Sequence, residues 1–390
     1  MSEGTLEYPL HEEPLAVLRR LRCDAPITKV TLWNGSQVWL ITRHADARRA
    51  LTEPQLSADA TDPGFPSINP SQMVPNQRGG PARVDDSRHA VMRAVIARWF
   101  TARAVERWQP LSQQIVEEQL HVLLDGGPPA DLVTRFALPV PLRLICAMLG
   151  VPPEDLGFVE QRGQLAVTRA YESARPAQRE LRDFVGELIR RAEKEPGDDL
   201  ISSVVAQRAA IDPDDLVDLL LIILVAGHTT TAGTISFGVH HLVQEPGALR
   251  ALRDNPARVA TTVEEFLRLQ TIVSDGAPRV AKQDVELGST MIRAGEGVII
   301  SLTSANHDED AFAGPDRLDP HRPDARRHLA FGWGVHRCLG QHLARLELRN
   351  AFAGLARAVP DLRLAVPAEQ VQSALREKHQ NTVYELPVTW

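Results

Sequence analysis

The sequence has few of the features that mark a secreted, membrane-spanning or nucleic-acid-binding protein. Its 390 residues include 3 cysteines, which are widely spaced and do not make a disulfide framework. The longest purely apolar run, Leu219–Ala226, is far shorter than the ~18–20 residues that a membrane span needs. A formal net charge of −7 argues against nucleic acid as a main partner, since duplex binding requires a basic face. The first residues lack the apolar core of a signal peptide, so we expect a reduced, cytoplasmic protein.

Aromatic residues are also scarce, at 5% of the chain, so aromatic stacking is not indicated. The hydrophobic fraction of 43% and the charged fraction of 24% are those of an ordinary globular protein. A chain of 390 residues can bury a large core. Because no internal repeat and no clean linker divides it, we interpret residues 1–390 as a single domain.

Short β-rich runs occur in two parts of the chain. Residues 27–43 hold two such runs separated by Asn34-Gly35, the dipeptide favoured in type I′ turns, which predicts a β-hairpin. Residues 284–292 and 295–302 are predicted as two further strands joined by a short turn. These runs are too few and too short for a large sheet.

A long helix is predicted in the middle of the sequence. Asp212 is a favourable capping residue, Pro213 suits the first helical position, and acids follow in the first turn. No further proline occurs before Pro246, so we expect a helix of about 33 residues, roughly 50 Å long. Helical patterns also fill most of residues 88–196, 256–269 and 340–359, so the predicted fold is mainly α with small β-sheets.

One cysteine lies in a glycine-rich stretch, FGWGVHRCLG, at residues 331–340. Glycine permits positive φ and a close approach of the backbone to a flat ligand. A helical pattern follows Cys338, so its sulfur precedes a helix N-terminus, where free N–H groups and the helix dipole stabilise a thiolate. Such a thiolate suits an axial haem ligand. From these residues alone, a catalytic nucleophile or a cysteine without a chemical role stays open.

The same stretch resembles the haem-binding signature of the cytochromes P450, Phe-x-x-Gly-x-x-x-Cys-x-Gly with a histidine two residues before the cysteine. The resemblance extends over nearly the whole chain. It implies the cytochrome P450 fold and a haem b whose iron is bound by the Cys338 thiolate, with Phe331, Gly332 and Gly340 in contact with the cofactor. It also implies cations for the two haem propionates, each of which alone could be a surface cation: His89, Arg93, Arg279, His336 and His328.

A structural triad is implied as well. Glu265 and Arg268 match the family's Glu-x-x-Arg, and Arg317 matches the arginine that completes its ion pairs. Spacing of i,i+3 places Glu265 and Arg268 on one helix face. We assign the three residues to holding the cysteine loop and not to chemistry.

The long helix carries an unusual polar cluster, AGHTTT, within its apolar run. By resemblance, this is the family's oxygen-pocket motif, in which a small residue and a glycine leave room for O₂ and a threonine hydroxyl bonds oxygen or a water. The matching residues, assigned to catalysis, are Ala226, Gly227, His228, Thr229 and Thr230.

Thr229 departs from the family pattern, because an acid that supplies protons usually precedes the pocket threonine. A threonine can bridge waters but cannot supply a net proton at neutral pH. His228 is a candidate relay, or it points away into neighbouring helices. Three alternatives follow from the missing acid. Bridged waters supply the proton path, or the substrate donates a hydroxyl or N–H into it, or the reaction is a radical coupling or ring closure. We therefore hypothesise a polar substrate of aromatic or heterocyclic type.

Substrate contacts are implied by resemblance from the Pro/Gly-rich stretch at residues 64–81, from residues 165–173, from the long helix and from residues 272–277 and 381–383. An apolar wall with some polar positions is expected there. The residues assigned to it are Ile222, Ile223, Ile272, Val273, Ser274 and Thr382.

The implied activity is oxidation of a small natural product in biosynthesis, using O₂ and electrons delivered one at a time. It proceeds by hydroxylation or by oxidative C–C or C–N coupling or ring closure. No flavin or nicotinamide fingerprint is present, so we expect a separate ferredoxin and ferredoxin reductase, and a monomeric protein. An acidic partner would be steered by arginines near the cysteine loop. Two alternatives are a peroxygenase that takes H₂O₂ directly and a non-catalytic haem sensor.

Overall fold

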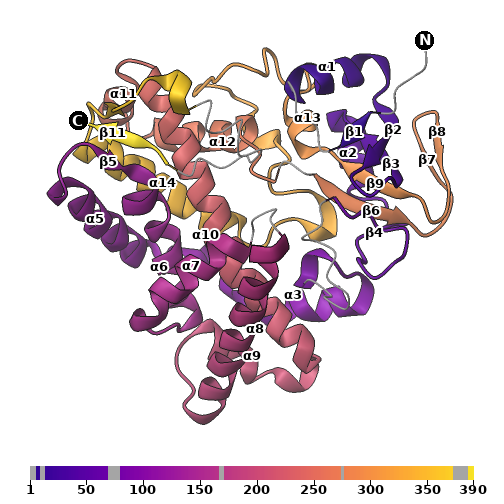
Figure 1. Ribbon diagram of the computed structural model, residues 1–390, viewed down its shortest axis with the longest axis horizontal. Coiled ribbons are helices and arrows are strands. Elements are labelled where there is room, and N and C mark those ends of the chain that lie inside the picture. Colours follow the sequence, from indigo (N-terminus) through magenta and orange to yellow (C-terminus); the bar gives the residue numbers. More distant parts are fainter. Residues whose placement is uncertain (1–5, 9–13, 69–79, 167–170, 274–275, 372–384) are drawn as a thin grey trace.

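The computed structural model confirms a mainly helical protein with small β-sheets (Figure 1). It describes residues 6–8, 14–68, 80–166, 171–273, 276–371 and 385–390. Its α-helices are α1 (Pro14–Asp24), α2 (His44–Ala50), α3 (Asp86–Phe100), α4 (Ala102–Glu106), α5 (Gln109–Asp125), α6 (Pro139–Leu149), α7 (Leu156–Ala166), α8 (Tyr171–Lys194), α9 (Leu200–Val205), α10 (Pro213–Gln244), α11 (Ala248–Asp254), α12 (Arg258–Leu269), α13 (Leu302–Asn306) and α14 (Gln341–Ala358).

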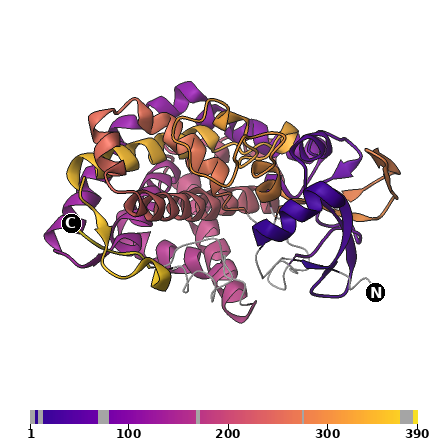
Figure 2. The same cartoon turned by 90° about the horizontal axis from the view of Figure 1, so that it is seen from above.

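The long helix predicted from the sequence is α10, which has 32 residues and runs across the middle of the molecule (Figures 1 and 2). The carboxylate of Asp212 caps it by accepting hydrogen bonds from the N–H groups of Asp214 and Asp215, at 2.9 and 3.3 Å. Within the described part of the chain, α10 alone is long and apolar enough to cross a membrane, and half of that stretch is buried inside the protein. It is therefore the central core helix, against which α6, α8 and α14 pack.

Three small sheets complete the fold. The largest lies at the end of the molecule that carries the N-terminus (Figures 1 and 2) and has the strand order β1-β2-β3-β9-β6-β4. The others are β10-β11-β5 and the hairpin β7-β8. The strands are β1 (Glu7–Tyr8), β2 (Ile27–Leu32), β3 (Gln37–Ile41), β4 (Leu56–Ser57), β5 (Ala130–Asp131), β6 (Ala277–Ala281), β7 (Val285–Leu287), β8 (Thr290–Ile292), β9 (Gly297–Ile300), β10 (Arg363–Leu364) and β11 (Pro387–Thr389).

The predicted hairpin is confirmed as β2 paired antiparallel with β3, but its turn is not of type I′. Gly35 has a φ of 81° while Asn34 does not have positive φ. The turn is closed by a 2.8 Å hydrogen bond from the Gly35 N–H to the Leu32 carbonyl, and the Asn34 side chain accepts from the Ser36 N–H. The Asn34 side chain therefore stabilises a wider loop, for which only one residue needs positive φ.

The second predicted strand pair is wrong in its connectivity. Residues 284–292 form two strands and not one, because Gly288 has a φ of 59° and reverses the chain between β7 and β8. The strand in residues 295–302 is β9, which pairs with β3 and β6 and not with its neighbour in sequence. The sheet therefore joins the N-terminal part of the chain to the segment that follows α12.

Candidate active site

The cysteine loop, residues 331–340, lies between the irregular segment that follows α13 and the start of α14. Its ends are closed by a hydrogen bond of 2.8 Å from the Cys338 N–H to the Phe331 carbonyl. Gly332 and Gly334 have φ values of 67° and 72°, in the region that favours glycine. A Cβ on Gly334 would also lie 2.6 Å from the Leu51 carbonyl oxygen, so this glycine lets the loop rest on α2. The predicted role of glycine in shaping the loop is confirmed for these two residues.

The thiol of Cys338 is exposed and at the same time closely surrounded by protein. Burial raises the pKa of the Cys338 thiol, while the Gly340 N–H and the guanidinium groups of Arg93, Arg345 and Arg337 act to lower it. The sulfur is therefore open to contact with a group that enters the site, although protein atoms surround it closely. The surrounding cations are those that would stabilise a thiolate bound to a metal.

One face of α10, at the polar cluster, is accessible. Ala226 is exposed in the middle of the buried core helix, and Ile222, Thr229 and Thr230 are half-buried. At ~100° per residue these four positions fall within one arc of the helix. The hydroxyls of Thr229 and Thr230 donate to the carbonyls of Val225 and Ala226, at 3.0 and 2.9 Å. Such bonds tend to bend a helix locally.

Gly227 and His228 lie outside this arc. A Cβ on Gly227 would lie 2.7 Å from Cγ1 of Ile145, so its missing side chain makes room for α6. His228 is fully buried, and its Nε2 packs where a Cβ of Gly163 in α7 would be. Its Nδ1 bonds the Leu224 carbonyl at 2.7 Å, and burial lowers the pKa of His228 to about 4. The imidazole therefore faces neighbouring helices, the second of the two predicted orientations.

Four of the five predicted haem-propionate partners gather at one place. The rings of His89 and His336 lie 4.3 Å apart between centroids. His336 also bonds Asp85 through Nε2 at 2.7 Å, an acid that the sequence did not suggest. Burial raises the pKa of the Asp85 carboxyl, but hydrogen bonds from His336, Ser57 and the Ala58 N–H outweigh this and hold it well below its usual range.

Arg279 and Arg93 supply fixed positive charge to this group. Arg279 is buried, and its guanidinium bonds only the neighbouring Pro278 carbonyl among the described residues. Burial lowers the pKa of Arg279 to about 10, so it stays charged near neutrality. Arg93 donates to the Arg337 carbonyl at 3.0 Å, beside the cysteine.

His328 belongs to another cluster, which forms around Glu264. Its Nδ1 accepts from the Ala330 N–H at 3.1 Å, so the proton is on Nε2, which contacts Glu264 at 3.2 Å. Arg345 binds the same carboxylate with two nitrogens, at 2.6 and 3.0 Å, and its guanidinium lies 4.6 Å from the centroid of the Phe331 ring. Both ring nitrogens of His328 are therefore hydrogen-bonded. Through Glu264 of α12, this cluster of His328, Glu264 and Arg345 supports the cysteine loop.

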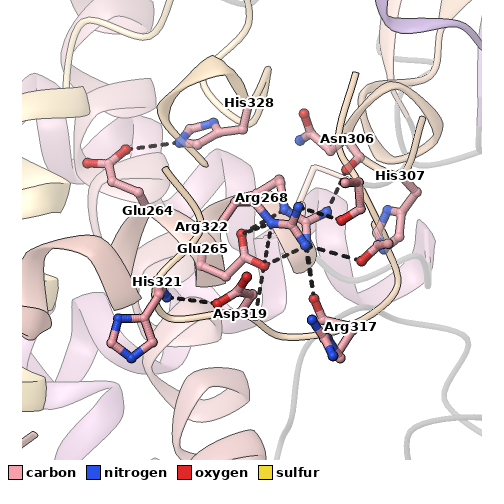
Figure 3. Close-up of polar contacts among 12 residues, drawn as sticks. Glu264, Glu265, Arg268, Asn306, His307, Arg317, Asp319, His321, Arg322 and His328 are labelled. Atoms are coloured by element: carbon pink, nitrogen blue, oxygen red, sulfur yellow. Dashed lines mark hydrogen bonds and ion pairs between the residues drawn. The ribbon is translucent and has the colours of Figure 1, made fainter. Parts of the chain in front are cut away.

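The predicted triad needs one correction, which Figure 3 shows. Glu265 and Arg268 are fully buried and joined by two hydrogen bonds of 2.7 and 2.8 Å. The third member is Arg322, whose Nε contacts both oxygens of Glu265 at 3.0 and 3.1 Å. Arg317 takes part only through its carbonyl oxygen, which accepts from Arg268 and Arg322. Arg268 also bonds the Asn306 carbonyl at 2.8 Å and so ties the triad to α13.

The predicted substrate-facing residues fall in three groups. Ile222 packs against Gly80, whose Cβ would lie 2.9 Å from Cγ2 of the isoleucine, so α10 meets the end of the Pro/Gly-rich stretch here. Ile223 and Ile272 are half-buried, and Val273 is 47% exposed. The remaining two lie outside the described residues: Ser274 and Thr382.

Several residues of the site were missed in the sequence. Arg322 follows Arg317 by five residues, in a stretch that has neither a helical nor a strand pattern. Its role becomes apparent only once its partner, Glu265, is known. Glu264 stands beside Glu265, and the pattern cannot say which acid pairs with which arginine. Asp85 precedes a helix and reads as a cap, although its side chain makes no cap bond and turns to His336 instead.

These residues fit a haem with a thiolate ligand. Nε2 of His89 is buried and has no hydrogen-bond partner among the described residues, and Arg279 is a buried cation whose one bond among the described residues goes to the Pro278 carbonyl. Such groups are costly to bury alone and would be satisfied by carboxylates such as propionates. Cys338, Arg93 and the accessible arc of α10 supply the other contacts that a flat iron cofactor needs.

Comparison with known proteins gives the same answer over the whole length. A family model described as cytochrome P450 matches residues 164–374. Cytochrome P450-SU2 of Streptomyces griseolus is 42% identical, with 94% of this chain and 91% of that protein covered. The crystal structure of GfsF, a cytochrome P450 of Streptomyces halstedii, superimposes with a TM-score of 0.92 at 38% identity, covering 99% and 100% of the two chains. A mycinamicin VIII methyl hydroxylase of Micromonospora griseorubida, in complex with mycinamicin VIII, superimposes with a TM-score of 0.90 at 33% identity and covers 99% and 100%.

Proposed function

The chain belongs to the cytochrome P450 family, and from that premise we propose that it oxidises a small natural product at a haem bound by Cys338. The observation that carries the proposal is the Cys338 thiol, which is exposed in a loop shaped by Gly332 and Gly334 while Arg93, Arg337 and Arg345 act on it. When bound, the haem supplies dioxygen activation, in which a thiolate ligand favours O–O cleavage.

The protein's own residues would hold the cofactor, shape the oxygen pocket and position water or substrate. Arg93, Arg279 and His89 would hold the propionates, and His336, whose ring nitrogens contact the Pro81 carbonyl and Asp85, would support them from beside His89. Ala226 leaves space on the pocket side of α10, and Thr230 orients oxygen or water there through its hydroxyl. Thr229 stands where an acid is usual, so it positions water or a polar group of the substrate but gives up no net proton.

The substrate is proposed to be a cyclic natural product with an aromatic or heterocyclic part and a hydroxyl or N–H group. The relatives support a biosynthetic role, since one is described as a mycinamicin VIII methyl hydroxylase. Ile222, Ile223 and Ile272 offer an apolar wall, and Thr229 offers a hydrogen bond to a polar substituent. The reaction is hydroxylation, or coupling or ring closure of the same substrate.

Electrons are proposed to come from a ferredoxin and its reductase, and the protein to act as a cytoplasmic monomer. Of the five arginines that the sequence places around the cysteine loop, Arg326, Arg327 and Arg349 are exposed. Arg345 is bound to Glu264, and Arg337 is half-buried over the Trp333 ring. The three exposed arginines form a basic surface on the thiolate side that would attract an acidic partner.

The test is an absorption titration of the purified resting protein with a panel of aromatic and cyclic natural products. The expected result is a low-to-high-spin shift of the haem band with at least one compound, which then enters turnover assays with a plant-type ferredoxin and its reductase. A protein that binds haem but neither shifts with any compound nor takes electrons from ferredoxin would contradict the enzymatic proposal and favour the sensor. Product formed with H₂O₂ but not with ferredoxin would favour the peroxygenase.

A further inference from the structure

An arginine just ahead of α3 has no partner in the structure. The side chain of Arg83 is half-buried, and its guanidinium makes no hydrogen bond or ion pair within the described part of the chain. Protein atoms surround the guanidinium closely, and this burial lowers the pKa of Arg83. A cation enclosed by protein without a partner is unfavourable, so we expect its partner to come from outside the chain.

The arginines of α3 itself show the contrast with Arg83. Arg88 pairs with the buried carboxylate of Asp215 in α10. Arg98, near the end of α3, donates to the Ser203 hydroxyl in α9. These two arginines therefore connect α3 to its neighbours, whereas the guanidinium of Arg83 takes no part in holding the fold.

The turn that carries Arg83 touches both sides of the candidate site. The Arg83 N–H donates to the Gly80 carbonyl at 3.1 Å. A Cβ on Gly80 would lie 2.9 Å from Cγ2 of Ile222, which belongs to the accessible arc of α10. On the other side, the Pro81 carbonyl contacts Nδ1 of His336 in the cysteine loop at 3.2 Å. The turn is therefore fixed between α10 and the cysteine loop, beside the space proposed for the cofactor and the substrate.

Arg83 stands apart from the cations assigned to the haem propionates. Burial and the charges of His336 and Arg93 lower the pKa of His89 to about 4, so these groups lie close enough to act on one another. Arg83 has no such effect on the pKa of Arg93 or Arg279. No charged group among the described residues acts on Arg83 either. Its guanidinium is therefore left for a different anion.

We propose that Arg83 binds a carboxylate of the substrate, so that the natural product oxidised here is an organic acid. The inference deepens the proposed function and rests on it. A guanidinium binds a carboxylate through two parallel hydrogen bonds, which fix its orientation as well as neutralise its charge. Ile222, which the Arg83 turn meets through Gly80, lies one helical turn, roughly 6 Å, before Ala226 on the same face of α10. The carboxylate therefore anchors one end of the substrate while a carbon further along the molecule meets the oxygen pocket.

The carboxylate does not replace the acid that is missing at position 229. At neutral pH a carboxylate has no proton to give. The hydroxyl or N–H group proposed beside Thr229 therefore belongs to a different part of the substrate. The substrate class is a cyclic acid with a second polar group.

The test uses probes that bind haem iron through an imidazole, so it does not require the substrate. The probes are phenylimidazole, imidazolylphenyl alkanoic acids of increasing chain length and the methyl esters of those acids, each titrated into the holoenzyme by its red shift of the haem band. In the wild type at least one acid is expected to bind about ten-fold or more tightly than its ester, the usual scale for a hydrogen-bonded charged pair. Arg83→Gln should abolish that preference and Arg83→Lys should keep part of it, while phenylimidazole should bind all three proteins alike.

Arg98→Gln is the matched control, because it removes the same charge from α3 at an exposed position. This variant should keep the wild-type preference for the acid. The proposal is overturned if no acid is preferred over its ester in the wild type, or if the preference survives Arg83→Gln, and either result leaves the proposed function standing. Absence of any shift with phenylimidazole in the wild type would instead contradict the haem site itself, and the inference with it.

A second measurement separates substrate recognition from a structural role of Arg83. Because the guanidinium has no partner to lose, Arg83→Gln should leave the thermal unfolding midpoint of the substrate-free holoenzyme unchanged or raise it. Transfer of haem from this variant to apomyoglobin should be as slow as from the wild type. A clear fall in the midpoint would show that Arg83 holds the fold, and faster haem loss would assign its guanidinium to a propionate. Either result would refute the assignment of Arg83 to the substrate.

Discussion

Single residues determine how firmly the cysteine loop is held. Arg322 links the Glu265 carboxylate to the carbonyls of Ala313, Gly314 and Arg317, so one guanidinium closes the segment that precedes the loop. Arg317 occupies the place in the sequence that the family pattern suggests, but contributes only its backbone. The glycines and the cysteine were predictable because their roles depend on the local sequence. The partner of a buried carboxylate depends instead on how an irregular segment folds, which the sequence pattern does not show.

The first prediction compares these two arginines. Arg322→Ala removes one cation from the buried Glu265 and should lower the free energy of unfolding by about 3–5 kcal/mol, the usual cost of breaking a buried pair. Arg317→Ala leaves its carbonyl in place and should change that free energy by about 0.5 kcal/mol or less. Chemical denaturation of the two variants measures both values. Equal losses would mean that Arg317 contributes through its side chain after all.

Thr229 is the residue at which this chain differs most from the family pattern. If the substrate already supplies the proton path, an added acid at position 229 has nothing to contribute. Thr229→Glu alone should therefore leave turnover of the compound found by titration unchanged or impaired, as measured by product formed per NADPH. A large gain in turnover would show that proton supply limits the wild type.

At the scale of elements, α10 is shaped by what packs on each of its faces. One arc is accessible and carries Ala226 and Thr230, while the opposite side packs against α6, α7 and α14. Its caps and length were predictable from Asp212, Pro213 and Pro246, because these act locally. The role of Gly227 was not, since a glycine in an oxygen-pocket motif and a glycine at a helix crossing look the same in sequence.

The prediction at this scale concerns that crossing. Gly227→Ala places a Cβ against Ile145 and should lower the free energy of unfolding by about 1–3 kcal/mol, as overpacking does. Gly186→Ala in α8 is the matched control, because its Cβ would meet only the end of Arg190 at 3.5 Å, and it should stabilise the helix by up to about 1 kcal/mol. In an Ile145→Ala background the Gly227→Ala cost should shrink. A loss of oxygen-dependent activity without any loss of stability would instead return Gly227 to the oxygen pocket.

At the scale of the whole molecule, two histidines with lowered pKa values link stability to pH: His228, which is fully buried, and His241, which is half-buried. Burial lowers the pKa of His228 to about 4, and burial with the nearby His240 lowers that of His241 to about 4 as well, from an ordinary 6.5. Between these values the unfolded chain binds more protons than the folded one. Their contribution to stability is therefore complete above pH 6.5 and is lost as the pH falls towards 4.

Thermal unfolding midpoints measured across that range should fall with pH. His228→Asn keeps a nitrogen where Nδ1 bonds the Leu224 carbonyl but does not titrate, so its midpoint should depend less steeply on pH. An unchanged slope in the variant would mean that His228 is not the group responsible.

At this scale, the charge distribution bears on the proposed electron donor. The net charge is −7, yet Arg326, Arg327 and Arg349, which are near Cys338 in the sequence, are exposed. The double variant Arg326→Glu, Arg327→Glu should slow reduction by ferredoxin several-fold and weaken its salt dependence, measured by stopped-flow absorption. Dithionite reduction is the control and should not change. Equal ferredoxin rates would place the docking surface elsewhere.

The central claim is that Cys338 binds haem iron as a thiolate. The most direct test is the carbon monoxide difference spectrum of the dithionite-reduced protein, with Cys338→Ser as the matched variant. The account predicts the strongly red-shifted Soret band of a thiolate-bound haem in the wild type and its loss in Cys338→Ser. A wild-type spectrum without that band, or a thiolate spectrum that survives the substitution, would contradict it.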